Sequence, residues 1–560
     1  MTQPDEHAMP SPHPNISITR AYVCVQGRQV HYRSCGQGPC VVLLHDSPRS
    51  SRLHLATMQF LAQRFTVVAL DTPGYGMSDP LPLANPGIED FAAFLGETLL
   101  KLGLERAPLY ATHTSAKIAL ALADAGGQMA RLVLDGLSMP ETLADEAFIA
   151  RYMRPFAPDD SGAYLAAEWS RQRDMLRWFP WFATRPESRI AMEAPDAAWM
   201  SDYGIDLFSA GPHYSDAYAA AMRYDPAPAL ARVTVPTLVA ARRDDVLHGY
   251  LERAETIGSP MVTTRSLPAD TAQWREWLLD TLATGAVETA LPAPEPAARH
   301  YARHRHGALH MTRYGPSDDQ PWLILSAPTT LQAQVWGHEI SRFCGAIVPD
   351  LPGFGESDPL PPGATLSDFA QVLIDAIAHM GIESVRVLGI GMAAPLAAAL
   401  AAACPERVAM VAVDGLPPIG RTFGQTLYPP IAFDALSGGH LHRIWHMLRD
   451  GETQWPWFDN SPAAQRRLPP IFAADALHRA LTGVLKQPDH WGQAAHAAME
   501  GNLAALWDGV NVPLMAFTHA DPAYADAPRL KNARLVARPD DTHAAAHLLA
   551  HLDAAQPEAT

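Results

Sequence analysis

Hydrophobic and polar positions along the first half of the chain follow two different periods. Residues 20–27 and 28–36 alternate polar and apolar side chains, which predicts an antiparallel pair of half-buried strands. The runs at 40–46 and 65–71 are apolar almost throughout, as is typical of strands buried on both faces of a parallel sheet. Residues 88–104 repeat apolar side chains every three or four positions, which predicts an amphipathic helix.

The same succession continues toward the middle of the chain. Residues 107–112, 131–136 and 235–241 have the composition of buried strands. An apolar helix is predicted at 115–125. Strands that alternate with helices in this way indicate a mainly parallel sheet flanked by helices. A segment rich in Trp and Met, residues 141–230, interrupts the alternation and has helical character, so we expect it to cover the carboxyl edge of the sheet as a cap.

A sequence repeat divides the chain into two parts of about one domain each. The stretch DTPGYGMSDPLP from Asp71 returns as DLPGFGESDPLP from Asp350, 279 residues later. LVLDGLSMP around Asp135 returns as VAVDGLPP around Asp414 with the same offset. Two further shared segments, PWF and one that begins with Val-Pro, follow in the same order. We therefore expect two tandem copies of one α/β domain.

The domain boundaries follow from this repeat. Residues 285–300 combine small residues with three prolines, a composition suited to a linker. We expect a disordered tail at 1–18, a first domain at 19–284 with its cap at about 141–230, the linker, and a second domain at 301–555 with its cap at about 419–508.

Composition narrows the classes of partner. Hydrophobic residues make up 48% of the 560 positions and charged residues 18%, which is enough apolar material for two cores. The formal net charge of −17 would repel a phosphate backbone, so we expect no nucleic-acid partner. The five cysteines are few and odd in number, which favours reduced thiols and a cytoplasmic protein. The polar N-terminus lacks signal-peptide features and the alanine-rich run at 392–404 is too short to span a bilayer, so we expect no membrane partner.

Four stretches carry a resemblance to a known family. They are LLHDSP at 43–48, D-x-P-G-x-G-x-S-D at 71–79, the strand, turn and helix at 110–120, and the R-D-D run that ends at Asp245. In these motifs the chain resembles the α/β-hydrolase superfamily, and the resemblance extends over nearly all of both copies. It implies two tandem α/β-hydrolase-fold domains, each a mainly parallel sheet flanked by helices with a helical cap insertion.

The nucleophile position departs from the family's pattern in both copies. The superfamily places a serine in G-x-S-x-G, on a strained turn between a strand and a helix. Matching the first copy to this turn puts His113 at the serine's place, and matching the second puts Gly391 there. Neither residue can form an acyl-enzyme by the serine route. Ser115, two residues later, is either a displaced nucleophile or, as we favour, a residue that caps or packs at the helix start.

The resemblance also implies positions for the acid and the base. Asp245 and Asp521 follow equivalent strands as acids, and only the second copy offers a histidine, His543, at the place of the base. The Asp521–His543 pair either activates water or, because His543 lies in an alanine-rich helix, is only a surface feature. Asp135 and Asp414, one strand earlier, are alternative acids or simply turn aspartates.

In the first copy a histidine at the turn would face the acid loop. His113 paired with Asp245 would have a fixed tautomer and a raised basicity, which makes it a candidate general base near neutral pH. The alternative is a packing or ligand-binding role for the ring. The backbone N–H of Thr114 and one from the loop that contains His45 and Asp46 are candidate donors to a substrate carbonyl.

Three further positions are candidates for substrate binding. Arg49 would bind a carboxylate unless it is simply solvated, and Trp181 would line a pocket unless it packs within the cap. Gly391 would leave room for a ligand in the second copy. The sequence contains no recognisable nucleotide-binding loop or metal-spaced cluster, so we expect neither a cofactor nor a metal.

These features favour a serine-independent hydrolase of a small ester, lactone or amide, with a His113–Asp245 general base in the first domain and a degenerate second domain. Two alternatives stay open, a cofactor-free lyase or isomerase and a non-catalytic ligand-binding or scaffold protein. In each case the expected partner is a small molecule, and the repeat itself would form an internal pseudo-dimer.

Overall fold

The computed structural model describes residues 16–190, 195–257, 259–294, 297–416, 423–500, 503–519, 530, 532–539 and 543–553. The chain forms two compact units. The first comprises Met1–Ala157 and Gln172–Ala297, and the second comprises Pro158–Arg171 and Ala298–Thr560. The main division therefore falls within residues 285–300, where we expect the linker. The expected N-terminal tail lies outside the described residues up to residue 15.

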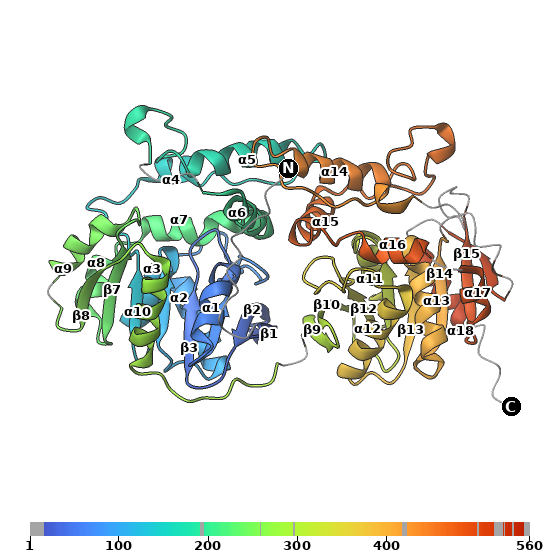
Figure 1. The fold of residues 1–560 in the computed structure, drawn as a ribbon, viewed down its shortest axis with the longest axis horizontal. Coiled ribbons are helices and arrows are strands. Elements are labelled where there is room, and N and C mark those ends of the chain that lie inside the picture. Colours follow the sequence, from blue (N-terminus) through green and yellow to red (C-terminus); the bar gives the residue numbers. More distant parts are fainter. Residues whose placement is uncertain are drawn as a thin grey trace, which may run out of the picture. The chain divides into compact units, whose positions relative to one another are not determined.

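The first unit is built on an eight-stranded sheet with the order β1-β2-β4-β3-β5-β6-β7-β8 (Figure 1). The β1–β2 and β2–β4 pairs are antiparallel, and every later pair is parallel. The strands are β1 Thr19–Val25, β2 Arg28–Cys35, β3 Cys40–Leu44, β4 Thr66–Leu70, β5 Leu109–Thr112, β6 Leu132–Asp135, β7 Thr237–Arg242 and β8 Val262–Leu267. The predicted mainly parallel sheet, with its antiparallel opening pair, is confirmed.

Helices flank this sheet because its central strands are apolar toward both faces. All five residues of β3 are buried. The apolar residues of α2 recur at helical spacing and are buried, and the helix ends at Gly103, whose φ of 68° is the usual left-handed terminus. The helices packed on the sheet are α1 Leu55–Leu61, α2 Ile88–Leu102, α3 Thr114–Asp124, α9 Leu251–Glu255 and α10 Thr271–Ala283.

A helical segment follows β6 where the cap is predicted. Its helices are α4 Glu146–Tyr152, α5 Ala163–Met175, α6 Ala197–Ala210, α7 Asp216–Arg223 and α8 Ala227–Arg232. Residues 158–171, which include most of α5, belong to the second unit. There the Tyr164 hydroxyl lies 2.6 Å from Nδ1 of His478, and the Trp169 ring meets the rings of Phe433 and His440 edge to face. The segment that we expect to form the first cap is therefore divided. Residues 158–171 belong to the second unit, where their aromatic side chains are buried, and the rest of the segment belongs to the first unit.

The second unit repeats the sheet order as β9-β10-β12-β11-β13-β14-β15-β16. Side chains alternate along β11, so Trp322 and Ile324 pack with α11 and α18 while Leu323 and Leu325 pack with α12 and α13. The strands are β9 Arg299–His304, β10 Gly307–Tyr314, β11 Trp322–Ser326, β12 Ala346–Pro349, β13 Val385–Ile390, β14 Val408–Asp414, β15 Leu514–Thr518 and β16 Arg534–Ala537. The helices are α11 Leu331–Ile340, α12 Leu366–His379, α13 Ala394–Ala403, α14 Gly439–Gly451, α15 Ala474–Lys486, α16 Gln493–Met499, α17 Leu503–Asp508 and α18 Ala544–Asp553.

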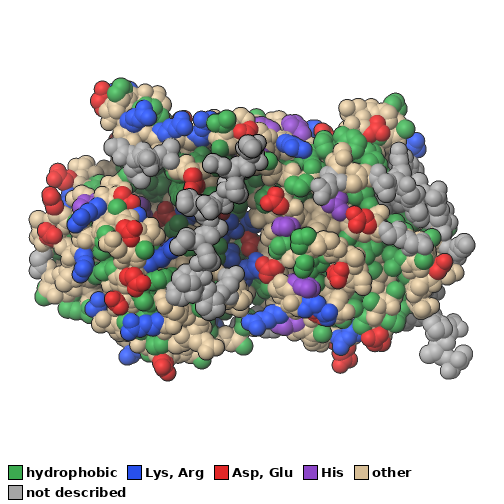
Figure 2. Space-filling model, in the orientation of Figure 1, with side chains coloured by type: hydrophobic (Ala, Val, Ile, Leu, Met, Phe, Trp, Pro, Cys, Tyr) green, Lys and Arg blue, Asp and Glu red, His purple; other side chains and the backbone are tan. Residues whose placement is uncertain are grey.

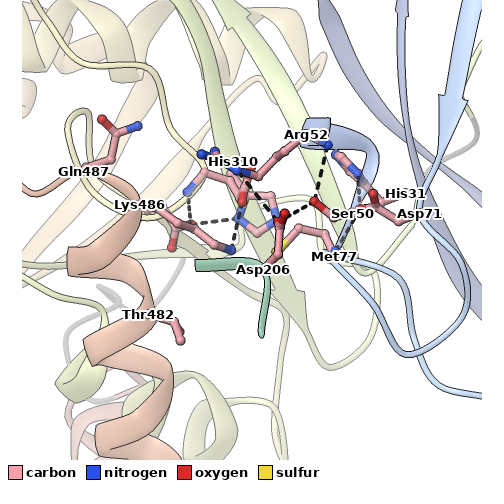
Figure 3. A network of polar contacts seen from close by, with 12 residues as sticks. His31, Ser50, Arg52, Asp71, Met77, Asp206, His310, Thr482, Lys486 and Gln487 are labelled. Carbon is pink, nitrogen blue, oxygen red and sulfur yellow. Dashed lines mark hydrogen bonds and ion pairs between the residues drawn. The ribbon is translucent and has the colours of Figure 1, made fainter. Parts of the chain in front are cut away.

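The repeated aspartate–proline–glycine stretch forms the turn after the fourth strand. Asp71 accepts hydrogen bonds from Nδ1 of His31 at 2.8 Å and from the Met77 N–H at 2.9 Å (Figure 3). It also accepts from the Ser51 N–H at 2.7 Å. Burial opposes ionisation of Asp71, but the charge and hydrogen bond of His31 hold the pKa of this carboxyl well below its usual range. In the second unit, Asp350 accepts in the same way from Nδ1 of His310 at 2.9 Å.

No described helix is long and apolar enough to cross a lipid bilayer. On the face of the first unit visible in Figure 2, acidic and basic side chains are interspersed.

The geometry of this turn predicts that one added methyl group, at Gly76, strongly lowers the free energy of unfolding. Gly76 has a φ of +54°, and a Cβ at this position would lie 2.2 Å from Oδ2 of Asp71. We expect Gly76→Ala to lower the free energy of unfolding of the first unit by about 1–2 kcal/mol through backbone strain and by about 1–3 kcal/mol more through displaced hydrogen bonds. Chemical denaturation measures this loss.

Gly27→Ala is the matched control for that substitution. Gly27 has a φ of +74° with no atom within 4 Å of an added Cβ, so it carries the backbone strain alone. Equal losses of stability in the two variants would contradict the role given to Asp71.

Candidate active site

A tight turn between β5 and α3 presents His113. Its φ of 49° and ψ of −109° are rare for a residue with a side chain, and such strain is retained mainly at functional positions. Ser115 holds the turn, because its hydroxyl donates to the Thr112 carbonyl at 3.0 Å and accepts from the Thr112 N–H at 3.1 Å. His113 itself donates its backbone N–H to the Asp135 carbonyl at 3.0 Å. Ser115 is therefore engaged in maintaining the turn.

His113 pairs with the aspartate that follows β7. Its Nε2 lies 2.8 Å from Oδ2 of Asp245, and the two side chains are 33% and 16% exposed. The Leu247 N–H donates to the other oxygen of Asp245 at 2.8 Å and so orients the carboxylate. Gly136 leaves room for the pair, because a Cβ there would lie 2.5 Å from the ring of His113 and 3.1 Å from Oδ2 of Asp245. The structure thus brings together two of the predicted site residues.

The surrounding carboxylates set the charge of the pair. Burial disfavours the imidazolium of His113, but the hydrogen bond and charge of Asp245, followed by the charges of Asp46 and Asp135, raise its pKa to about 9. Burial raises the pKa of Asp245, yet His113 outweighs that effect and the pKa lies below its usual value. At neutral pH the pair is an ion pair.

Asp135, the alternative acid, is engaged elsewhere. It is buried and accepts from the Tyr110 hydroxyl at 2.8 Å and from Nε1 of Trp274 at 3.1 Å. Burial raises the pKa of this carboxyl. Asp135 therefore acts on His113 through its charge and its backbone carbonyl.

A cavity of about 510 Å³ lies against His113. Its wall is mainly apolar, and its volume suits a small organic molecule. The lining residues with polar side chains are Ser47, His113, Thr114, Lys117, Ser138, Thr142, Asp145, Tyr218 and Tyr250, and the others are Pro140, Leu143, Ala144, Phe148, Phe179, Ala221, Met222 and Leu247. Thr114 begins α3, where backbone N–H groups lack partners within the helix, so it can supply a donor to a carbonyl.

The loop after β3 contains the other predicted donors. His45 is buried, with Nδ1 2.7 Å from the Asp46 carbonyl and Nε2 accepting from the Thr72 N–H at 2.9 Å. These two contacts of the His45 ring therefore stabilise the conformation of the loop. Oδ1 of Asp46 is buried and makes no hydrogen bond to any described residue.

Arg49 and Trp181 make contacts within the first unit and are not among the described residues that line the cavity. The buried Arg49 donates Nε to Oδ2 of Asp206 at 2.8 Å. Ser50 donates to the other oxygen of Asp206 at 2.6 Å, as Figure 3 shows. Trp181 donates Nε1 to the Tyr152 carbonyl at 2.8 Å. Arg49 thus joins the loop to α6 through an ion pair.

The second unit has the same turn without a side chain. Gly391 has a φ of 49°, as His113 does, at the end of β13. The cavity beside this turn has a volume of about 80 Å³. His543 is exposed just before α18, and Asp521 lies outside the described residues.

Asp414, at the end of β14, is buried among cationic and polar groups. It accepts from Nε2 of His519 at 2.8 Å, from Nε of Arg538 at 2.7 Å and from Nε1 of Trp336 at 2.9 Å. Burial opposes its ionisation, but His519 and Arg538 hold its pKa well below the usual range. Sequence reasoning missed this cluster because its members come from separate strands and a helix.

Two residues of the first site were also missed. Lys117 is the one charged residue within the apolar run 116–123 of α3, a signal that the sequence contains. Gly136 follows a buried strand, and only the three-dimensional structure shows what its missing side chain accommodates.

Comparison with known proteins agrees with the fold. Residues 41–267 match the family described as alpha/beta hydrolase family, and residues 344–430 match the alpha/beta hydrolase fold. The chain belongs to the α/β-hydrolase superfamily and carries two tandem copies of its fold.

The curated relatives include a haloalkane dehalogenase and an uncharacterized protein. Haloalkane dehalogenase 2 of Mycobacterium tuberculosis is 31% identical over 123 residues, which cover 21% of this chain and 43% of that protein. An uncharacterized protein of the same species is 31% identical over 105 residues, 19% of this chain and 30% of that one. The chain thus spans less than half of the length of these curated relatives.

Among solved structures, a thermophilic esterase from Thermogutta terrifontis is 20% identical, with 48% of this chain and 97% of that chain covered and a TM-score of 0.36. Epoxide hydrolase A from Mycobacterium thermoresistibile is 20% identical, with 48% and 98% covered and a TM-score of 0.37.

The geometry predicts that Gly136→Ala separates His113 from Asp245. Because the folded-state pKa of His113 is raised from 6.5 to about 9, the pair contributes stability that is fully present below pH 6.5 and is lost as the pH rises through about 9. We expect Gly136→Ala to remove this part of the pH dependence, measured by chemical denaturation at several pH values.

Gly126→Ala serves as the control, since Gly126 has a φ of +95° and open space around an added Cβ. It should keep the pH dependence of the parent protein. The same pH dependence in both variants would show that Gly136 does not accommodate the pair.

Proposed function

We propose that the first unit is a cofactor-independent hydrolase of a small ester, lactone or amide. The observation that carries the proposal is that His113, on a strained turn in the wall of a cavity of about 510 Å³, lies 2.8 Å from Asp245. A histidine at a φ of 49° costs about 1–2 kcal/mol relative to glycine, the residue that the second unit has there. Retention of that cost favours a chemical role for the ring.

The pair determines which ring nitrogen exchanges protons. When His113 is neutral, Nε2 carries the proton donated to Asp245, so Nδ1 is the acceptor. In the proposed reaction, Nδ1 takes a proton from water as the water oxygen attacks the substrate carbonyl. The backbone N–H of Thr114 stabilises the negative charge that this attack places on the carbonyl oxygen of the substrate. The imidazolium then returns the proton to the leaving oxygen or nitrogen, and an acid and an alcohol or amine are released.

The second unit is proposed to be non-catalytic. Its turn carries Gly391, and the cavity beside that turn is about 80 Å³. The acid at the end of β14, Asp414, is engaged by His519 and Arg538. Such a unit would support the first one as a folding or binding partner.

A second candidate function is ligand binding without turnover. It is favoured by the raised pKa of His113, about 9, because the ring is then mostly protonated at pH 7. An imidazolium at the cavity wall suits an anionic ligand. A lyase or isomerase that uses the same proton transfer is the remaining enzymatic alternative.

The direct experiment is hydrolysis of a panel of small esters, lactones and amides. We expect turnover by the parent protein and a loss of at least about 100-fold in His113→Gly and Asp245→Asn. His113→Gly is informative because glycine removes the ring while accepting the same backbone angles. Below pH 9, kcat/KM should rise about tenfold per pH unit, since the neutral ring is the active form.

His543→Ala is the control in the second unit and should retain the parent activity. Turnover that survives His113→Gly, or a kcat/KM that is flat between pH 6 and about 9, would contradict the general-base role. A complete absence of turnover in the parent would favour the ligand-binding function.

A further inference from the structure

A buried lysine lies in the same cavity wall. Lys117 is on α3, one helical turn beyond His113, and the residue is only 3% exposed. It lines the cavity together with His113 and Thr114. The positions of residues 113 and 117 differ by about 6 Å along a helix axis. The cavity wall therefore includes two cationic residues, His113 and Lys117.

The ammonium of Lys117 has hydrogen-bond partners but no counter-ion. Nζ donates to the Ala221 carbonyl at 2.8 Å and to the Tyr224 carbonyl at 3.0 Å, at the C-terminal end of α7. Among the ion pairs within 4 Å that the described residues form, none includes Lys117, and Asp225 acts on it only as a more distant charge. Burial lowers its pKa to about 8.

His113 has a counter-ion, which Lys117 lacks among the described residues. His113 is balanced by Asp245 at 2.8 Å. A buried cation without a counter-ion is costly, and an anion that enters the cavity would reduce that cost. An ammonium has three N–H groups, of which the two carbonyls engage two.

The other residues that line the cavity indicate the chemistry of the remainder of the ligand. Leu143, Phe148, Phe179 and Met222 give the cavity an apolar surface, and the lining also includes the carboxylate of Asp145, whose Oδ1 accepts from the Phe148 N–H at 2.7 Å. In the second unit the residue that corresponds to Lys117 in the turn alignment is Pro395, so the feature belongs to the first unit alone.

We propose that the cavity binds a molecule with an apolar body and a carboxylate, and that the carboxylate is bound by the ammonium of Lys117. The assignment of a substrate rests on the proposed function. The substrate is then a carboxylate-bearing ester, lactone or amide, whose carbonyl lies at His113 while its carboxylate lies one helical turn away. The binding itself does not depend on turnover.

The test compares 3-phenylpropanoate with its neutral counterpart 3-phenylpropanamide by isothermal titration calorimetry. We expect the parent protein to bind the carboxylate at least about tenfold more tightly than the amide. Lys117→Arg, which keeps the charge, should retain a preference. Lys117→Gln, which keeps donors for the two carbonyls, and Lys117→Met should bind both probes with similar affinity.

Equal affinity of the parent for the two probes, or no binding of either up to about 10 mM, would overturn the proposal. So would a preference that persists in Lys117→Gln. His113→Gly distinguishes the roles of the two cationic residues. This variant should keep the preference for the carboxylate if Lys117 binds it. Loss of the preference in His113→Gly would overturn the assignment to Lys117. A parent that binds the carboxylate but hydrolyses no substrate would refute the proposed function and leave this inference standing.

Discussion

The turn between β5 and α3 imposes a left-handed backbone on residue 113, and the first site depends on that constraint. The turn is held by Ser115 and by the Asp135 carbonyl, so the ring of His113 has a fixed origin above the sheet. Asp245, 132 residues later, then holds the ring from the end of β7. Gly136 has no side chain to obstruct them. The strained backbone of residue 113, its ion pair with Asp245 and the missing side chain of Gly136 together determine the position of the His113 ring.

The two units show what the same constraint allows when the residue changes. Both turns have a φ of 49°, but glycine carries little cost there and histidine carries a real one. The second unit is relieved of strain and has a small cavity beside its turn. The first retains the strain together with a cavity of 510 Å³. The duplicated fold therefore serves as an internal comparison for the chemistry of its first copy.

The fold could be predicted in more detail than the site. Continuous apolar runs such as residues 40–46, and the repeat from Asp71 to Asp350, indicate buried parallel strands and a tandem fold, because strand burial and turn chemistry are local properties of sequence. The charge state of His113 and the ion pair of Arg49 with Asp206 depend on groups far apart in the chain. Periodicity contains no information on such pairs.

The titration of the His113 ring by NMR, in the parent protein and in Asp245→Asn, tests the central claim most directly. The account predicts a pKa of about 9 in the parent and a fall toward 6.5 in the variant, because Asp245 is the largest influence that favours the imidazolium. A pKa near 6.5 in the parent that does not change in Asp245→Asn would contradict it.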